Sequence, residues 1–260
     1  HGAGERMNLI LSRISITIAG LASLLRFTWP LFIKAEEQDE TLLAQTIFFV
    51  LMPLVLILVL IEFATGDISS KQLALLGVLI ALNAVIRLLG AGTAGIETAF
   101  FLIILGAFVF GSGFGFILGA SSILVSALLS GGIGPWLPFQ MMGAALVGLG
   151  AGLIPRTNRR WLQNTWLIGY SVLASFVYGG LMTMWNWPYL AGVGTQLSYV
   201  PGDDLLSNLT RFVQYEIVTG GLVWDLGRAI TTSILILLTG TALIATLRRA
   251  ATRAGVGREL

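Results

Sequence analysis

The sequence contains 260 residues, of which 56% are hydrophobic and only 11% are charged, and its formal net charge is +2. Soluble domains carry about 25% charged residues, so this composition excludes an ordinary soluble protein and predicts one that uses lipid as its solvent. The sequence has no cysteine, and its one histidine is His1. These counts exclude disulfides, sulfur-ligated metal centres and histidine-based catalysis.

The first 69 residues are predicted to hold a short leader and two helices. The start His1-Gly-Ala-Gly-Glu-Arg6 is typical of the remnant of an expression tag. We therefore expect residues 1–6 to be a tag remnant or disordered, with Met7 as the native start. Residues 7–69 contain two long apolar runs, which predict transmembrane helices at about 13–33 and 46–65.

Six further apolar runs occupy the rest of the chain. They predict helices at about 71–89, 96–110, 114–130, 138–154, 164–186 and 226–247. Because these runs are unbroken, they favour helices over the alternating strands of a barrel. The sequence thus predicts an all-α integral membrane protein of about eight transmembrane helices, in which a six-helix domain at 70–250 follows two extra helices and precedes a cytoplasmic tail at 251–260.

The basic residues predict the orientation of the chain. Most of the fifteen Lys and Arg fall on one side of this arrangement, namely Arg6, Arg13, Lys71, Arg156, Arg159, Arg160, Arg248, Arg249, Arg253 and Arg258. Because loops rich in Lys and Arg stay in the cytoplasm, we expect both termini to be cytoplasmic. The chain is then a multi-pass protein of a cell membrane.

Two features of helix 71–89 deserve separate interpretations. Gly77 and Ala81 are four residues apart and share one face, where small side chains let another helix approach closely. That face either packs within the subunit or docks a partner helix. Arg87 and Glu97 flank the outer end of the same helix, and charges at this depth pair with each other or line a ligand pocket.

Two aromatic segments predict a small-molecule site on the outer side. The segment Gly131-Gly-Ile-Gly-Pro-Trp-Leu-Pro-Phe-Gln140 has two prolines that restrict the backbone, and Pro138 is suited to a first helical turn. The second segment is Trp185-Asn-Trp-Pro-Tyr189. Apolar walls with a few polar groups are typical of ligand pockets, whereas an aromatic belt at the membrane surface explains the same residues without a ligand. Besides Arg87 and Glu97, the candidate substrate-binding residues are Trp136, Phe139, Gln140, Trp185, Asn186, Trp187, Tyr189, Gln196 and Tyr199.

The long outer segment 188–225 is predicted either to cover this site as a lid or to form an ordinary ordered loop. Within it, Phe212–Val218 has the pattern of a short interfacial helix. Asp225 is predicted to cap the last helix and to pair with Arg228. No nucleotide-binding or hydrolase motif occurs in the sequence.

Four stretches together resemble a known family. They are Lys71-Gln-Leu-Ala-Leu-Leu-Gly-Val-Leu-Ile-Ala81, Phe114-Gly-Phe-Ile-Leu-Gly119, Gly131 to Gln140, and Gly148-Leu-Gly-Ala-Gly-Leu-Ile-Pro155. In residues 70–250 the chain resembles the substrate-binding S components of energy-coupling factor (ECF) vitamin transporters, and within them the cobalamin-type branch.

The resemblance implies a membrane subunit that captures a vitamin at the outer face. Its implied partners are a transmembrane coupling protein, docked through Gly77 and Ala81, and two cytoplasmic ATPase subunits; no nucleic acid is expected. No intrinsic cofactor is implied, and cobalamin is the expected substrate. Another vitamin or precursor, a polytopic membrane enzyme and a ligand-free membrane scaffold remain as alternatives.

Overall fold

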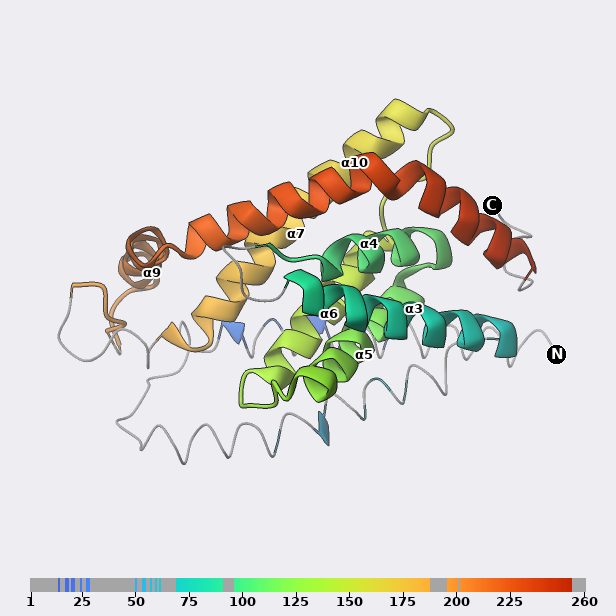
Figure 1. The fold of residues 1–260 in the computed structure, drawn as a ribbon. Helices are drawn as coiled ribbons and strands as arrows, with labels where there is room; N and C mark the ends of the chain where they lie inside the picture. Colours follow the sequence, from blue (N-terminus) through green and yellow to red (C-terminus); the bar gives the residue numbers. More distant parts are fainter. Residues whose placement is uncertain are drawn as a thin grey trace.

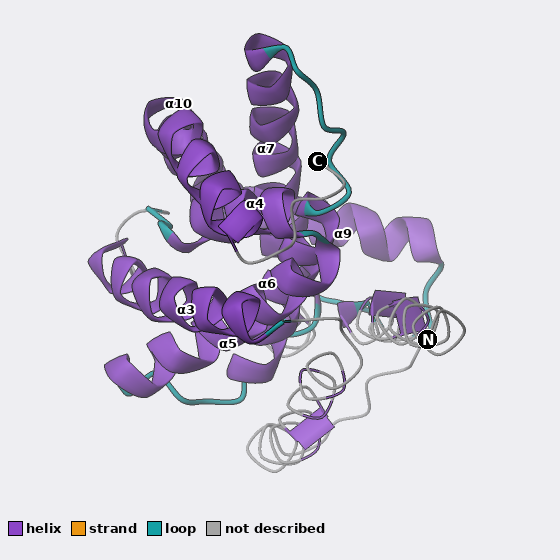
Figure 2. Cartoon of the chain, turned by 90° about the vertical axis from the view of Figure 1, so that its right-hand side faces the viewer, coloured by secondary structure: helices purple, strands orange, loops and turns teal. Residues whose placement is uncertain are grey.

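The computed structural model of the chain describes residues 69–90, 96–187, 196–200 and 202–253, together with a few single positions between 14 and 61. All regular secondary structure in these residues is helical, as predicted (Figure 2). The helices with described bounds are α3 (Ser70–Gly90), α4 (Ala99–Phe110), α5 (Ser112–Ser130), α6 (Leu137–Ala151), α7 (Arg160–Met184), α9 (Leu205–Thr219) and α10 (Gly221–Arg253). Apart from the single positions, the two helices predicted at 13–33 and 46–65 lie outside the described residues.

Helix α4 lies at the centre of the bundle. It contacts α3, α5, α6, α7 and α10. In Figures 1 and 2, α7 and α10 lie on one side of α4, and α3, α5 and α6 lie on the other. Every residue from Ala99 to Val109 is buried. Because other helices enclose α4, its sequence is apolar on all faces, a pattern typical of a buried helix.

Four described helices are long and apolar enough to cross a membrane, namely α3, α5, α7 and α10. Helices α4 and α6 are apolar but shorter. At 1.5 Å per residue, the 12 residues of α4 measure about 18 Å, whereas the hydrocarbon core is about 30 Å thick. The described residues therefore confirm an all-helical membrane bundle, and the total of eight spans stays a prediction.

Glycines bring α5 and α6 into backbone contact. A Cβ atom added at Gly115 would overlap the backbone of Gly148, and one added at Gly148 would overlap the backbone of Gly115. Gly119 and Ala144 meet in the same way one turn further along. Small residues permit this close approach in a membrane, so these glycines serve the packing of α5 against α6.

The helix ends follow from local sequence. Ser69 and Gln72 form a capping box at the start of α3, because the Ser69 amide donates to Gln72 Oε1 at 2.7 Å and the Gln72 amide donates to Ser69 Oγ at 3.3 Å. A single residue, Gly111, joins α4 to α5 with φ of 99°, a conformation that glycine adopts readily. Pro138 occupies the first turn of α6, as predicted.

The structure corrects the bounds of the last two helices. The interfacial helix predicted at Phe212–Val218 is the longer α9, which begins after the cap Asp204. Helix α10 begins at Gly221, so the prediction that Asp225 caps it is wrong. It also continues to Arg253, beyond the predicted end at residue 247. Arginine is a good helix former, so the arginine run marks the end of the apolar segment rather than the end of the helix.

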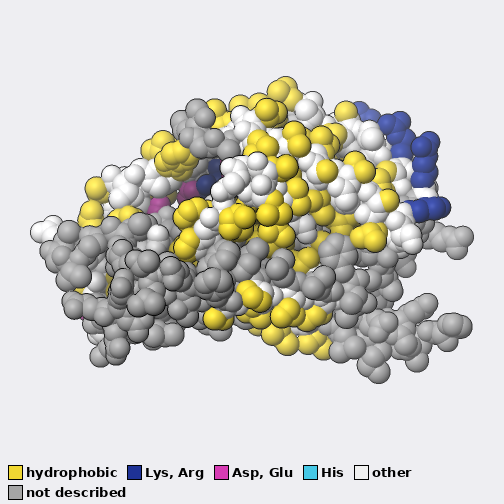
Figure 3. Space-filling view, turned by 60° about the horizontal axis from the view of Figure 1, so that its bottom comes forward, with side chains coloured by type: hydrophobic (Ala, Val, Ile, Leu, Met, Phe, Trp, Pro, Cys, Tyr) yellow, Lys and Arg dark blue, Asp and Glu magenta, His cyan; other side chains and the backbone are white. Residues whose placement is uncertain are grey.

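Charged side chains separate to the two ends of the bundle (Figure 3). Lys and Arg gather where α3 and α7 begin and α6 and α10 end, which we call the basic end; these residues are Lys71, Arg156, Arg159, Arg160, Arg248, Arg249 and Arg253. The opposite end, which we call the acidic end, carries the acids of the described ranges, namely Glu97, Asp203, Asp204, Glu216 and Asp225. This separation agrees with the predicted asymmetry of the loops.

Candidate functional site

The acidic end collects most of the residues predicted to bind substrate. Arg87 lies in the last turn of α3, and Glu97 lies just before α4. Trp136–Gln140 form the start of α6, and Trp185–Trp187 directly follow α7. Because these helix ends meet at one end of the bundle, segments far apart in sequence become neighbours.

Arg228, a largely buried cation at this end, contacts a carboxylate, a backbone carbonyl and two aromatic rings. Its Nη1 donates to Asp225 Oδ1 at 2.6 Å and to the carbonyl oxygen of Ser175 at 3.1 Å. Its guanidinium lies 5.0 Å from the ring centroid of Tyr178 and 5.7 Å from that of Phe100. A carboxylate and two aromatic faces thus replace the water that this cation has lost. The predicted Asp225–Arg228 ion pair is confirmed.

Arg87 makes weaker contacts. Its Nε lies 4.0 Å from Glu97 Oε1, so the predicted ion pair is present but too long for a hydrogen bond. Its Nη1 donates to Ser126 Oγ of α5 at 3.0 Å. Within the described part of the chain, the buried Nε has no hydrogen-bond partner. Arg87 therefore keeps a donor that a bound ligand can use.

Tyr178 of α7 contacts Arg228 and is also influenced by the charge of Arg87. Its hydroxyl is within electrostatic range of Arg87, Glu97, Asp225 and Arg228. Its ring packs edge-on against Phe100, with centroids 4.8 Å apart. We call this group, with Glu216, the ion cluster; its members are Arg87, Glu97, Tyr178, Glu216, Asp225 and Arg228.

Glu216 joins the ion cluster from α9, and its side chain is buried with 5% exposure. Its carboxylate lies against Gly221, where a Cβ atom would overlap it. Burial raises the pKa of Glu216 above its ordinary value, and the charge of Arg228 lowers it only in part. A carboxyl group held in this way is suited to meet a hydrogen-bond donor or a cation.

The two predicted aromatic segments meet through Phe139 and Trp185. Their rings stack nearly parallel, with an interplanar angle of 7° and centroids 3.9 Å apart. Phe27, a described residue of the N-terminal part, packs on Phe139 at 5.5 Å. All three side chains are buried. The stack therefore joins α6, α7 and the N-terminal part at the acidic end.

Trp187 belongs to a separate small core. It is fully buried, and its ring meets Tyr199 and Phe212 edge-on at 5.7 Å and 5.4 Å. Its Nε1 donates to the carbonyl oxygen of Leu197 at 3.0 Å. These contacts fasten the segment at 196–200 and helix α9 to the end of α7. A role for Trp187 and Tyr199 in contacting substrate remains a prediction.

The other predicted binding residues differ in exposure. Trp136 is 46% exposed, and Gln196 is also exposed. Gln140 and Asn186 are half-buried, and each directly follows one member of the Phe139–Trp185 stack in the sequence. Tyr189 lies outside the described residues. Trp136, Gln140 and Asn186 are thus the predicted residues that present accessible side-chain surface near the stack.

Buried polar groups continue below Arg87. Asn83 lies one turn nearer the basic end on α3, and Ser122 lies one turn nearer than Ser126 on α5. Both side chains are fully buried, and neither has a hydrogen-bond partner within the ranges that the structure covers. An unsatisfied buried polar group costs about 1–3 kcal/mol. These two residues therefore provide donors and acceptors for water or a ligand.

The predicted docking residues lie on an open face of α3. Gly77 and Ala81 are exposed, and a Cβ atom added at Gly77 would meet no atom within 4 Å. Ala74, three residues before Gly77, is exposed on the same side. The prediction that this face packs within the subunit is not met by the described residues, which leave it free for a partner.

Sequence reasoning missed the roles of Tyr178 and Glu216. Glu216 is the one acidic residue of α9, but in a helix that also carries Asn208, Arg211 and Gln214 a single carboxylate is a weak signal. Tyr178 gave no such signal, because an aromatic residue in an apolar helix is ordinary. Only the packing of α10 on α7 brings Arg228 onto its ring.

The fold and the ion cluster define the class of this protein. Four apolar helices long enough to span a lipid bilayer, with ionisable groups buried at one end, are features of a multi-pass membrane protein that handles a polar solute. The family model of the ECF transporter substrate-specific component matches residues 71–247, which is more than half of the chain. The chain therefore belongs to this family. No curated protein and no solved structure matches the chain.

Membership of the family establishes the general role. The chain is a membrane-embedded, substrate-binding subunit of an ECF importer, and such a subunit is part of a transporter and not an enzyme. Members of the family dock with an ECF coupling and ATPase module. The predicted recognition of an S component is thus confirmed for residues that nearly coincide with the predicted domain at 70–250.

Proposed function

We propose that the chain captures cobalamin at its acidic end, on the outer side of a cell membrane. The observation that carries this proposal is the Phe139–Trp185 stack, which joins the stretch Gly131 to Gln140, one of the four that carry the resemblance, to the second aromatic segment. Around the stack, Trp136, Gln140 and Asn186 offer accessible surface. An apolar wall with a few polar groups is what a small-molecule site requires.

The chemistry of cobalamin suits these groups. Cobalamin is large and rich in amides, which both donate and accept hydrogen bonds. Gln140 and Asn186 are uncharged partners for such amides, and the unsatisfied Nε of Arg87 is a further donor. The sequence after His1 contains no histidine, so we expect no imidazole to replace an axial ligand of cobalt.

Delivery is proposed to use the open face of α3. Gly77 and Ala81 would let a helix of the coupling protein approach the backbone closely. Two separate ATPase subunits would then supply the energy, and the subunit would reorient in the membrane to release its substrate. With both termini cytoplasmic, the basic end carrying Lys71 and Arg253 faces the coupling and ATPase module.

Absorption spectroscopy of the purified subunit tests the substrate. We expect cyanocobalamin to remain bound through gel filtration and to keep the spectrum of the free vitamin, because no imidazole is available. A panel of other vitamins at the same concentration serves as the comparison. Retention of a different vitamin, with no retention of cobalamin, would refute the assignment of substrate and leave the family role intact.

A vitamin that carries a carboxylate is the second candidate. The ion cluster contains Arg87 and Arg228, and arginine pairs with carboxylates in a bidentate geometry. Arg87 favours this candidate because its only described partners are Ser126 at 3.0 Å and Glu97 at 4.0 Å. In the same panel, this candidate predicts that binding is lost when Arg87 is replaced by Gln and when the carboxylate of the vitamin is amidated.

A further inference from the structure

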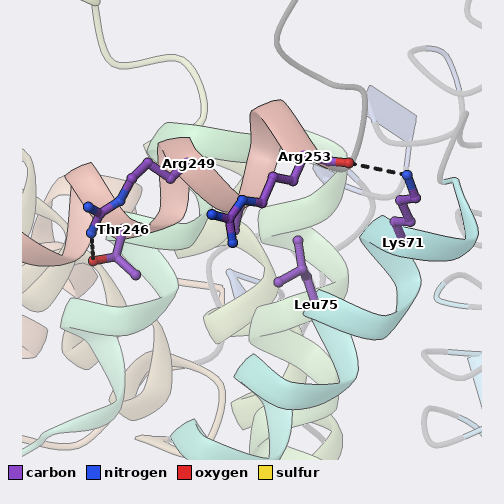
Figure 4. Close-up of a pocket in the computed structure, with 6 residues that line it drawn as sticks. Lys71, Leu75, Thr246, Arg249 and Arg253 are labelled. Carbon is purple, nitrogen blue, oxygen red and sulfur yellow. Dashed lines mark hydrogen bonds between the residues drawn. The ribbon is translucent and has the colours of Figure 1, made fainter.

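A groove at the basic end lies between the first turns of α3 and the last turns of α10 (Figure 4). Its volume is 490 Å³, which is within the range of about 300–1,000 Å³ that is usual for ligand sites. The lining residues are Lys71 and Leu75 of α3, and Thr246, Arg249, Ala250 and Arg253 of α10. We call it the basic groove. It is at the opposite end of the bundle from the ion cluster.

The cations of the basic groove have only neutral partners among the described residues. Lys71 Nζ donates to the backbone carbonyl oxygen of Arg253 at 3.3 Å, and Arg249 Nη2 donates to Thr246 Oγ1 at 3.2 Å. The ion pairs of the described chain all lie at the acidic end. Three positive charges thus line one hollow with no acid among its described lining residues, an arrangement that favours a bound anion.

Figure 4 shows how these side chains are placed. The side chain of Arg253 runs back along α10, and in this view Leu75 lies between its guanidinium and Lys71, whose amine points toward the end of α10. Arginine forms paired hydrogen bonds with phosphate oxygens, and lysine adds a compact positive charge. Lys71 and Arg253 therefore bring positive charge to the hollow from both of the helices that line it, at two separate places.

Exposed apolar side chains lie on the two helices of the basic groove, both within it and nearer the middle of the bundle. Leu75 and Ala250 form its apolar lining. Along the same two helices, Val78 of α3 is 63% exposed and Leu238 of α10 is 78% exposed. Both helices flank α4 without packing along each other. A ligand of the basic groove thus meets charge at one end and apolar surface at the other.

We propose that the basic groove binds the headgroup of an anionic phospholipid from the leaflet at the basic end. The cations select the phosphate, and the exposed apolar surface of α3 and α10 selects a ligand with acyl chains over a free phosphate ion. Basic pockets between membrane helices are suited to such headgroups. The bound lipid connects the start of α3 to the end of α10, which otherwise share little contact.

Native mass spectrometry of the subunit, released from vesicles of phosphatidylcholine with one fifth phosphatidylglycerol, tests this proposal. The groove variant is Lys71→Gln, Arg249→Gln and Arg253→Gln, and the control is Arg156→Gln, Arg159→Gln and Arg160→Gln. Both variants lose the same charge at the same end. We expect wild type and control to retain phosphatidylglycerol, and the groove variant to bind it roughly fivefold more weakly for each cation removed.

Thermal unfolding in detergent provides a second readout. Added phosphatidylglycerol should raise the unfolding temperature of the wild type and the control but not that of the groove variant. A variant with Arg249→Lys and Arg253→Lys should show a smaller rise than the wild type.

Equal loss of lipid from the groove variant and the control would overturn the proposal, because the effect would then be general surface charge. It would also be overturned if inorganic phosphate stabilised the wild type as well as the lipid does. Loss of coupling-protein binding by the groove variant, with unchanged lipid binding, would assign the groove to an acidic protein surface instead.

Discussion

The carboxylate of Asp225 on α10 lies directly against the backbone of Gly179 on α7. A Cβ atom at Gly179 would overlap both carboxylate oxygens. The contact places Asp225 Oδ1 2.6 Å from Nη1 of Arg228, so the close approach of the two helices and the buried ion pair depend on each other. Glycine at position 179 is thus a requirement of the ion cluster.

Replacing Gly179 by Ala should therefore destabilise the protein. We expect a loss of about 1–3 kcal/mol, the usual cost of an extra methyl group in a filled core. The matched control is Gly180→Ala, because a Cβ atom at Gly180 meets no atom within 4 Å. The control should be neutral or slightly stabilising through helix propensity. Thermal unfolding in detergent measures both, and equal behaviour of the two variants would contradict the contact.

Removal of Arg228 should be more costly, since it leaves the buried Asp225 without its cation. For Arg228→Gln we expect a loss of about 3–5 kcal/mol. The double variant Arg228→Gln with Asp225→Asn should be less destabilised than the sum of the two single variants, because the uncompensated charge is gone. A double-mutant cycle of unfolding measurements determines this difference, and simple additivity would show that the pair contributes no coupling.

Stability should fall as the pH rises through the titration of Glu216. Its pKa is raised by burial above the ordinary value of 4.5, so in that range the folded state holds a proton that the unfolded state has released. The folded state then binds more protons, and stability decreases with pH. Glu216→Gln should flatten this decrease between pH 4.5 and the raised pKa. Unfolding temperatures of both proteins across this range test the assignment, and parallel curves would refute it.

Substitution of Trp136 can distinguish a role in substrate binding from a role in folding. Because its side chain is 46% exposed, Trp136→Ala should change stability by less than about 1 kcal/mol. If Trp136 forms a wall of the substrate site, the same change should weaken vitamin binding by about tenfold or more, as loss of a buried aromatic contact does. Trp161→Ala at the basic end, where Trp161 is 64% exposed, is the control. Equal vitamin affinity of the two variants would remove Trp136 from the site.

Gly77→Leu should block docking of the coupling protein while leaving the subunit folded. The position is open, so the added side chain meets no part of the subunit but would obstruct a closely packed partner helix. Gly169→Leu makes the same change at an equally open position on α7. We expect copurification with the coupling protein to be lost only for Gly77→Leu. Assembly of both variants would show that another face docks.

The sequence predicted the helices well because membrane spans have a strong signal. Unbroken apolar runs located α3 to α7 to within a few residues. Their ends were harder to predict, since charge marks the end of the apolar run and not of the helix; α10 therefore begins before Asp225 and continues to Arg253. The charged residues at the two ends were also separated correctly by the rule for basic loops.

The site was predicted only in part, because its members act through tertiary contacts. The Arg87–Glu97 pair was predictable from two charges in a short segment of an apolar chain. The stack of Phe139 on Trp185 and the burial of Trp187 depend on how α6, α7 and α9 meet, which no local pattern encodes. Likewise, nothing in the spacing of Tyr178 indicated that the guanidinium of Arg228 would lie over its ring.

The backbone contact between Gly115 and Gly148 limits how this molecule can move. With no side chains between them, α5 and α6 have no layer of atoms that can rearrange, so sliding of one past the other would separate the two surfaces altogether. The pair is expected to behave as one rigid body. Any rearrangement of the bundle then has to take place around this glycine-joined pair, which serves as a fixed frame.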